Sequence, residues 1–171
     1  MLGSIYPEAK RLAETICTAY RNQHRLPIVN VRPFAFIGPY QLLDRPWAIN
    51  NFIRDSLRGG PIRILGDGKT VRSYMYPSDM ALWILTILTK GSNGASYNIG
   101  SPYGVTLKEL AEIIADNFSN SPEIILNFSN NKNFKTTKFV PDVSLAQKEL
   151  GLKLNVDLSK AIERTIQWNQ I

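Results

Sequence analysis

Tyr6 and Lys10 are the two residues whose types and spacing most directly suggest chemistry. They lie four positions apart in the segment SIYPEAKRLAE, residues 4–14, and side chains at that spacing meet on one face of a helix. A nearby ammonium favours the phenolate form of a tyrosine, which can take a proton from a substrate hydroxyl. The pair therefore suits an alcohol oxidation. Two observations count against it: Pro7 disfavours helical backbone at Tyr6, and chance alone produces such spacings in a chain with seven tyrosines.

Two further polar residues occupy positions where a ligand could bind. Arg72 follows the turn segment GDG, and a guanidinium there could clamp a phosphate through two parallel hydrogen bonds. Its alternative role is that of an exposed strand arginine. Asn98 comes at the end of an expected strand beside a glycine, where its amide could bind a ligand or form a local turn bond, and chemistry alone favours the turn bond.

The composition limits the class of protein. The chain has 171 residues, of which 44% are hydrophobic and 20% are charged, as in one globular domain. No apolar run or leader pattern points to a membrane or to secretion, so we expect a cytoplasmic protein. With one cysteine and one histidine, we expect no metal site. The net charge of +6 is scattered; we expect no nucleic-acid binding, and a phosphate-bearing small molecule accounts for the charge equally well.

The elements that must position these residues alternate between helices and strands. Apolar periodicity predicts helices over residues 7–23, 46–60, 77–91, 106–118 and 157–170, with a short one capped by Asp142 or Ser144. Apolar runs predict strands at 26–31, 61–65, 71–76, 95–101 and 123–128.

Several of these elements carry more detailed expectations. The first strand should be a buried parallel one, and the strands within 61–76 should form a hairpin around GDGKT. The helix at 77–91 should be capped by Ser78 or Asp79 and buried on most sides, and TLKE should open the next helix as a capping box. The polar stretch 129–138 should be a mobile loop.

The order of the motifs resembles that of a known family. The segments YPEAKRLAE, VRPFAFIGPY, ILGDGKTVRSYMYPSDMA, YNIGS and FVPDVSLAQKELGL, with a closing AIERTIQW, resemble the C-terminal half of the extended short-chain dehydrogenase/reductase family, the NAD-dependent nucleotide-sugar epimerases and dehydratases. The resemblance implies an α/β fold: the C-terminal part of a Rossmann-like parallel sheet plus a small α/β substrate-binding domain. It implies that residues 1–45 are the last helix and strand of a truncated Rossmann domain, and that residues 46–171 are the nucleotide-sugar binding region.

The resemblance also implies a catalytic and cofactor site. Tyr6 would be the acid/base that works on a sugar hydroxyl as hydride passes to the nicotinamide of NAD. Lys10 would favour the phenolate of Tyr6 and hold the nicotinamide ribose. Pro33 and Phe34 would border the nicotinamide.

For the substrate region, the resemblance implies that Arg72 binds the diphosphate of a nucleotide-sugar. Asn98 would lie in the same lobe, and Lys138 is a weaker candidate for the same anionic group. The chain departs from the family pattern at Ala35, where the family usually has an asparagine that contacts phosphate, and at Ser73, which replaces an aspartate.

The chain also lacks the glycine-rich strand, turn and helix that binds a dinucleotide pyrophosphate. We therefore expect a fragment of an enzyme that, when intact, oxidises the sugar at C4, and we expect it to be inactive alone, without tight NAD binding. Whether Met1 is the native start stays open. The alternative is a non-catalytic binding or assembly module. In both cases an open strand edge and an apolar helix face predict a homo-oligomer or a partner chain that supplies the N-terminal half.

Overall fold

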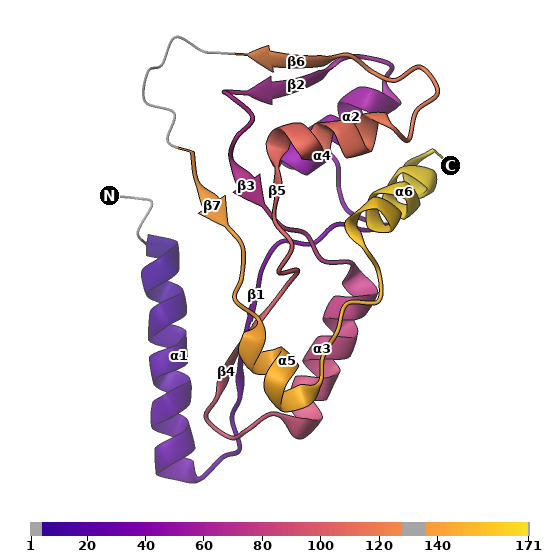
Figure 1. Ribbon diagram of the computed structural model, residues 1–171. Coiled ribbons are helices and arrows are strands. Elements are labelled where there is room, and N and C mark those ends of the chain that lie inside the picture. Colours follow the sequence, from indigo (N-terminus) through magenta and orange to yellow (C-terminus); the bar gives the residue numbers. More distant parts are fainter. Residues whose placement is uncertain (1–4, 128–135, 171) are drawn as a thin grey trace.

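The computed structural model describes residues 5–127 and 136–170 of the chain. Its helices and strands are interspersed along the chain (Figure 1). In chain order they are α1 (Ile5–His24), β1 (Asn30–Pro33), α2 (Ala48–Leu57), β2 (Ile62–Leu65), β3 (Val71–Arg72), α3 (Pro77–Lys90), β4 (Ser96–Ile99), β5 (Val105–Thr106), α4 (Leu107–Ala115), β6 (Ile124–Asn127), β7 (Lys138–Phe139), α5 (Ser144–Leu150) and α6 (Leu158–Asn169). None of the helices in the described ranges is long and apolar enough to cross a membrane.

Strands β1 and β4 form a parallel pair, in a register that runs from Asn30 opposite Ser96 to Pro33 opposite Ile99. In Figure 1 this pair lies between α1 and the two helices α3 and α5. The prediction of a buried strand over residues 26–31 is wrong in two respects, because β1 begins at Asn30 and three of its four side chains are exposed. In the part of the chain that the structure describes, β1 pairs only with β4, so its other edge and much of its surface stay accessible.

A first buried cluster fills the space between β4 and the helices α3 and α5. Trp83 and Tyr97 are its largest members and are fully buried, and the Trp83 indole donates a hydrogen bond to the carbonyl of Lys153 at 3.2 Å. The other buried members of the cluster are Met75, Ile87, Ile99, Val143, Ala146 and Leu152.

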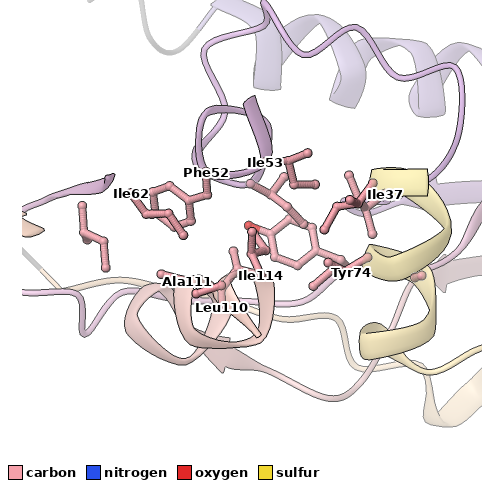
Figure 2. Close-up of a cluster of buried hydrophobic side chains, with 14 residues drawn as sticks. Ile37, Phe52, Ile53, Ile62, Tyr74, Leu110, Ala111 and Ile114 are labelled. Carbon is pink, nitrogen blue, oxygen red and sulfur yellow. The ribbon is translucent and has the colours of Figure 1, made fainter. Parts of the chain in front are cut away.

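A second and larger cluster lies under α2, α4 and α6 (Figure 2). Its centre includes Phe52 and Ile53 of α2, Leu110 and Ile114 of α4, and Tyr74 after β3. Helix α4 opens with the predicted capping box, in which Thr106 accepts from the Glu109 N–H at 3.1 Å and the Glu109 carboxylate accepts from the Thr106 N–H at 2.7 Å. The predicted helices around α2, α4 and α6 are confirmed, with shorter bounds.

The predicted hairpin at residues 61–76 is wrong. Strand β2 pairs in parallel with β6, whereas β3 pairs with β5 (antiparallel) and with β7 (parallel). The turn between them does exist, because Gly66 and Gly68 have positive φ and the Asp67 carboxylate accepts from the Lys69 N–H at 3.0 Å. The turn redirects the chain, but burial of Ile62 and Ile64 in the larger cluster decides the partner of β2.

Helix α3 differs from the prediction in its cap and in its burial. Tyr76 is the N-cap residue and makes no side-chain capping bond, and Pro77 begins the helix. Asp79 is buried and accepts from the backbone N–H groups of Asn155 and Val156 at 2.9 and 3.0 Å. Against the described residues only one face of α3 is covered, and four large apolar side chains point outward, namely Leu82, Ile84, Leu85 and Leu88.

Two smaller expectations concern the segment before α5. Asp142 accepts from the Ser144 N–H at 2.9 Å, one residue before the observed N-cap at Val143. Of the polar stretch 129–138, expected to be a mobile loop, residues 129–135 lie outside the described residues, and Lys138 belongs to strand β7 instead.

Candidate active site

Helix α1 brings Tyr6 and Lys10 together. The helix begins at Ile5, so Tyr6 has helical backbone, and the expectation that Pro7 would prevent this is wrong. Proline is tolerated in the first helical turn because the N–H groups there have no partner within the helix. The Lys10 ammonium lies 5.5 Å from the centre of the Tyr6 ring. Both side chains are exposed, with Tyr6 at 72%, so a ligand can reach the pair.

A pocket of about 460 Å³ opens beside this pair, between α1 and β1. We call it the dyad pocket. Tyr6 and Lys10 line it from the helix, and Pro33 and Phe34, the residues expected to border a nicotinamide, line it from the end of β1. Phe139 closes it from β7 and stacks on Phe34, with ring centres 4.7 Å apart and planes inclined by 25°. The wall formed by these two rings is flat and apolar.

A second pocket of about 600 Å³ adjoins the first, and we call it the arginine pocket. The two pockets share Tyr6, Pro33, Phe34 and Phe139 as wall residues. The arginine pocket adds polar and aromatic groups from more distant parts of the chain, among them Gln41, Trp47, Thr70, Arg72 and Tyr74. An acid/base candidate and a guanidinium therefore line the same space.

Backbone hydrogen bonds set the distance between the two walls of the arginine pocket. The Met75 N–H donates to the Ala35 carbonyl at 3.1 Å, and the Ile37 N–H donates to the Met75 carbonyl at 3.0 Å. These bonds join the segment after β1 to the segment after β3. They therefore link the two segments that bring Phe34 and Arg72 to the same pocket.

Hydrogen bonds orient the guanidinium of Arg72. Its Nη1 donates to the carbonyls of Val71 and Thr137 at 2.8 and 3.2 Å, and its Nη2 donates to the Thr137 hydroxyl at 3.0 Å. A guanidinium carries five N–H donors, so donors remain for an anionic ligand.

Tyr74 also lines the arginine pocket, and its side chain belongs to the larger buried cluster. Burial raises the pKa of Tyr74 to about 12, and the neighbouring Arg72 cation opposes that rise. Its hydroxyl therefore stays protonated at neutral pH and can donate a hydrogen bond.

Asn98 and Lys138 line neither of the two pockets. The Asn98 amide donates to the carbonyl of Asp142 at 3.0 Å and so ties β4 to the start of α5. Lys138 is exposed on β7, next to Phe139. In the described part of the chain, no cluster of three or more histidine, cysteine or acidic residues could hold a metal ion.

Sequence reasoning missed two aromatic wall residues, Trp47 and Phe139. Trp47 precedes α2 as its N-cap residue and is 56% exposed, which is unusual for a tryptophan without a ligand or partner. Phe139 belongs to the motif FVPDVSL, but its place beside Phe34 depends on the pairing of β7 with β3. Neither position had a local signal of function.

Comparison with known proteins identifies the family. Residues 2–100, more than half of the chain, match the model of the NAD dependent epimerase/dehydratase family. The chain belongs to this family. UDP-glucuronic acid decarboxylase 3 of Arabidopsis thaliana is 33% identical over 93% of the chain and 46% of the relative. The chain spans less than half the length of this relative and of UDP-glucuronic acid decarboxylase 1, of which it covers 37%.

Solved structures of epimerases and dehydratases share the fold. A dTDP-glucose 4,6-dehydratase from Streptomyces venezuelae, solved with NAD bound, is 26% identical with a TM-score of 0.76, over 96% of this chain and 50% of that chain. A UDP-glucose 4-epimerase from Thermotoga maritima gives a TM-score of 0.85 at 24% identity, over 96% of this chain and 53% of that chain. These likenesses confirm the predicted α/β, Rossmann-like fold.

NAD, the cofactor that the resemblance implied, is the cofactor of the epimerase/dehydratase family. The residues that line the dyad pocket fit the nicotinamide end of NAD. The dyad pocket offers a lysine and a tyrosine beside the flat Phe34 wall, which suits a nicotinamide and its ribose. The printed sequence has no glycine-rich strand, turn and helix for the pyrophosphate.

Proposed function

We propose that this chain carries the catalytic dyad and the nucleotide-sugar site of an NAD-dependent epimerase/dehydratase. One observation carries the proposal: Tyr6 and Arg72 line the same pocket. A nucleotide-sugar whose diphosphate contacts Arg72 would extend its sugar toward Tyr6. The net charge of +6 also favours such a dianionic substrate.

In the intact enzyme the reaction begins with oxidation of the sugar at C4. Tyr6 accepts the proton of the C4 hydroxyl, and the Lys10 ammonium favours the phenolate that performs this step. NAD, when bound, would supply the acceptor for the hydride that leaves the same carbon. The C–H and O–H bonds break and a ketone forms. Pro33 and Phe34 would place an apolar surface beside this carbon.

The substrate class follows from the donors of the arginine pocket. Ala35 offers no side-chain donor, so Arg72 and the protonated Tyr74 are the groups that we assign to the diphosphate. Lys138 would reach an anionic group at the rim from its exposed position beside Phe139. Asn98 could contact the same anionic group only after its amide released the carbonyl of Asp142. The relatives named for UDP-sugars and dTDP-sugars support a nucleoside diphosphate sugar.

As part of the same proposal, residues 1–45 belong to a dinucleotide-binding sheet and residues 46–171 form the nucleotide-sugar region of a cytoplasmic enzyme. These residues alone would bind NAD weakly and would not turn over. The lack of a glycine-rich motif in the printed sequence supports this. Activity would then require a second chain or further sequence that supplies the motif.

Calorimetric titration tests the proposal. We expect heat from UDP-glucose or UDP-glucuronic acid, loss of that heat in Arg72→Ala, and little heat from NAD. Arg63→Ala is the matched control, because Arg63 is an exposed arginine on β2 that lines neither pocket. Absence of heat with every nucleotide-sugar would contradict the proposed site. NADH formation by these 171 residues alone would contradict the claim that they are inactive.

A second function, a non-catalytic assembly module, is favoured by a different observation. Against the described residues, α1 has no buried side chain and β1 has an open edge. An open edge and exposed apolar helix faces favour association with another copy or with a partner chain. This function predicts self-association at micromolar concentration and no heat of binding with any nucleotide-sugar. A light-scattering mass equal to one chain would contradict it.

A further inference from the structure

The stripe by which α1 meets the rest of the molecule is polar. Only Glu14, Cys17 and Arg21 of this helix are partly buried, and their spacing of three and four residues places them on one face. The apolar side chains of Leu12 and Ile16 are 59% and 48% exposed. Against the described residues, hydrophobic burial therefore contributes little to the placement of α1.

Glu14 and Arg32 form the contact nearest to the candidate dyad. The Arg32 Nε donates to Glu14 Oε1 at 2.7 Å, and Arg32 Nη2 donates to Glu14 Oε2. A two-bond contact between a guanidinium and a carboxylate fixes direction as well as distance. The hydrogen bond from Arg32 also holds the pKa of Glu14 below its ordinary value.

The positions of these two residues in the chain give the contact its importance. Glu14 lies one helical turn beyond Lys10, and Arg32 immediately precedes Pro33 on β1. Both residues line the dyad pocket, on opposite walls. The contact therefore bridges the helix that carries the dyad and the strand that leads into the apolar wall.

A second contact holds the far end of α1. The Arg21 guanidinium donates to the Asn93 carbonyl at 3.4 Å and lies against Gly94, which has a φ of +87°. A Cβ at position 94 would lie 1.4 Å from Arg21 Nη1. This contact is two turns farther from the dyad than Glu14, so of the two contacts the Glu14–Arg32 pair lies nearer to the dyad.

We propose that the Glu14–Arg32 pair is the positioning element of this site and holds Tyr6 and Lys10 in register with Pro33 and Phe34. The inference rests on the proposed function only in taking Tyr6 and Lys10 as the dyad. Glu14 and Arg32 are positioning residues, because they act through the placement of α1.

Cys17 provides a direct test, since it is the only cysteine of the chain and faces the dyad pocket. We expect Glu14→Gln to raise its rate of alkylation by an uncharged reagent about fivefold, because reactivity follows the population in which α1 is open. The matched control is Glu8→Gln. Glu8 is a carboxylate on the same helix whose ion pair, at 3.3 Å, is with Arg11 of the same helix, so its loss should leave the rate unchanged.

Charge reversal separates positioning from a general loss of stability. Arg32→Glu alone should raise the Cys17 rate, and Glu14→Arg combined with Arg32→Glu should return it toward the wild-type value. Hydrogen exchange should rise in α1 and not in α3. A uniform rise in both helices, or failure of the reversed pair to restore the rate, would overturn the proposal.

Fluorine NMR of fluorotyrosine-labelled protein reports on the dyad itself. Tyr6→Phe assigns the Tyr6 resonance, which should move in Glu14→Gln as the surroundings of Tyr6 in the dyad pocket change, and should return in the reversed pair. A Tyr6 resonance identical in Glu14→Gln and Glu8→Gln would contradict the proposal. Neither readout needs NAD or a nucleotide-sugar, so failure here is distinct from failure in the calorimeter.

Discussion

Helices α1 and α4 are held against the rest of the molecule by different kinds of contact. Helix α4 has nine residues, four of which are buried, and it begins with a complete capping box. Helix α1 has twenty residues, none of which is buried against the described chain, and it is held through polar contacts at Glu14 and Arg21. The comparison separates a rigid scaffold, which carries Arg72 and Tyr74, from a loosely held helix, which carries Tyr6 and Lys10.

Helix α3 shows the same contrast within one element. Trp83 and Ile87 are fully buried against β4 and α5, whereas Leu85 and Leu88 are 59% and 70% exposed. The exposed apolar face of α3 is a candidate contact surface. The scaffold is thus complete under α2, α4 and α6 and is covered on one side only around β1 and β4.

The largest expected effect comes from removing the same side chain in the two regions. Ile53→Ala should destabilise the protein by about 3 kcal/mol, because Ile53 is fully buried and its truncation leaves a cavity. Ile16→Ala, on α1, should change stability by less than about 0.5 kcal/mol. Urea unfolding followed by tryptophan fluorescence measures both. An equal loss in Ile16→Ala would mean that another copy of the chain covers α1.

A somewhat smaller loss is expected at the buried carboxylate of α3. Asp79→Asn should cost about 2 kcal/mol, because Asp79 is buried and two backbone N–H groups and the Asn155 amide, at 2.8 Å, all donate to its carboxylate. Asp67→Asn is the control, since Asp67 is partly exposed and accepts from the Lys69 N–H. Equal urea midpoints for the two variants would show that Asp79 does not anchor the segment before α6.

Acid should loosen α1 before it loosens the scaffold. The hydrogen bond from Arg32 holds the pKa of Glu14 below the ordinary 4.5, so the pair stabilises the folded state above that pH. This stabilisation is lost as the pH falls through 4.5 and below. The fluorinated Tyr6 resonance should move in this range while the amides of α2, which has five buried residues, stay protected. Glu14→Gln should abolish the change, and a pH dependence that survives in Glu14→Gln would contradict the assignment.

The smallest effect concerns the helix caps. Thr106→Ala should cost about 1 kcal/mol by removing the cap of α4. Ser78→Ala should cost almost nothing, because Tyr76 is the N-cap residue of α3 and Ser78 is exposed. Thermal unfolding compares the two, and a larger loss in Ser78→Ala would restore the original expectation for that cap.

Local patterns in the sequence were enough to predict where the helices lie along the chain. The period of Leu110 and Ile114, with the Thr106 and Glu109 cap, identifies α4 from a few neighbouring residues. The partner of β2 could not be found in this way, because β6 lies some sixty residues later and the turn at Asp67 points to a nearer strand. Apolar composition also could not show which face of α3 would be covered.

In the candidate site, too, some features have a local sequence signal and others arise only from tertiary structure. The spacing of Tyr6 and Lys10 and the motif at Pro33 and Phe34 are local, and the structure places all four around one pocket. The Glu14–Arg32 contact and the place of Phe139 arise from tertiary structure and had no local signal.

The central claim is that nucleotide-sugar binding belongs to the scaffold and the chemistry to α1. The most direct test is the affinity for UDP-glucose, measured by calorimetry, in Tyr6→Phe and in Arg72→Ala. We predict wild-type affinity in Tyr6→Phe and a loss of at least about tenfold in Arg72→Ala, the factor expected when a charged hydrogen-bond partner is removed. Equal affinity in Arg72→Ala and the wild type would contradict the account.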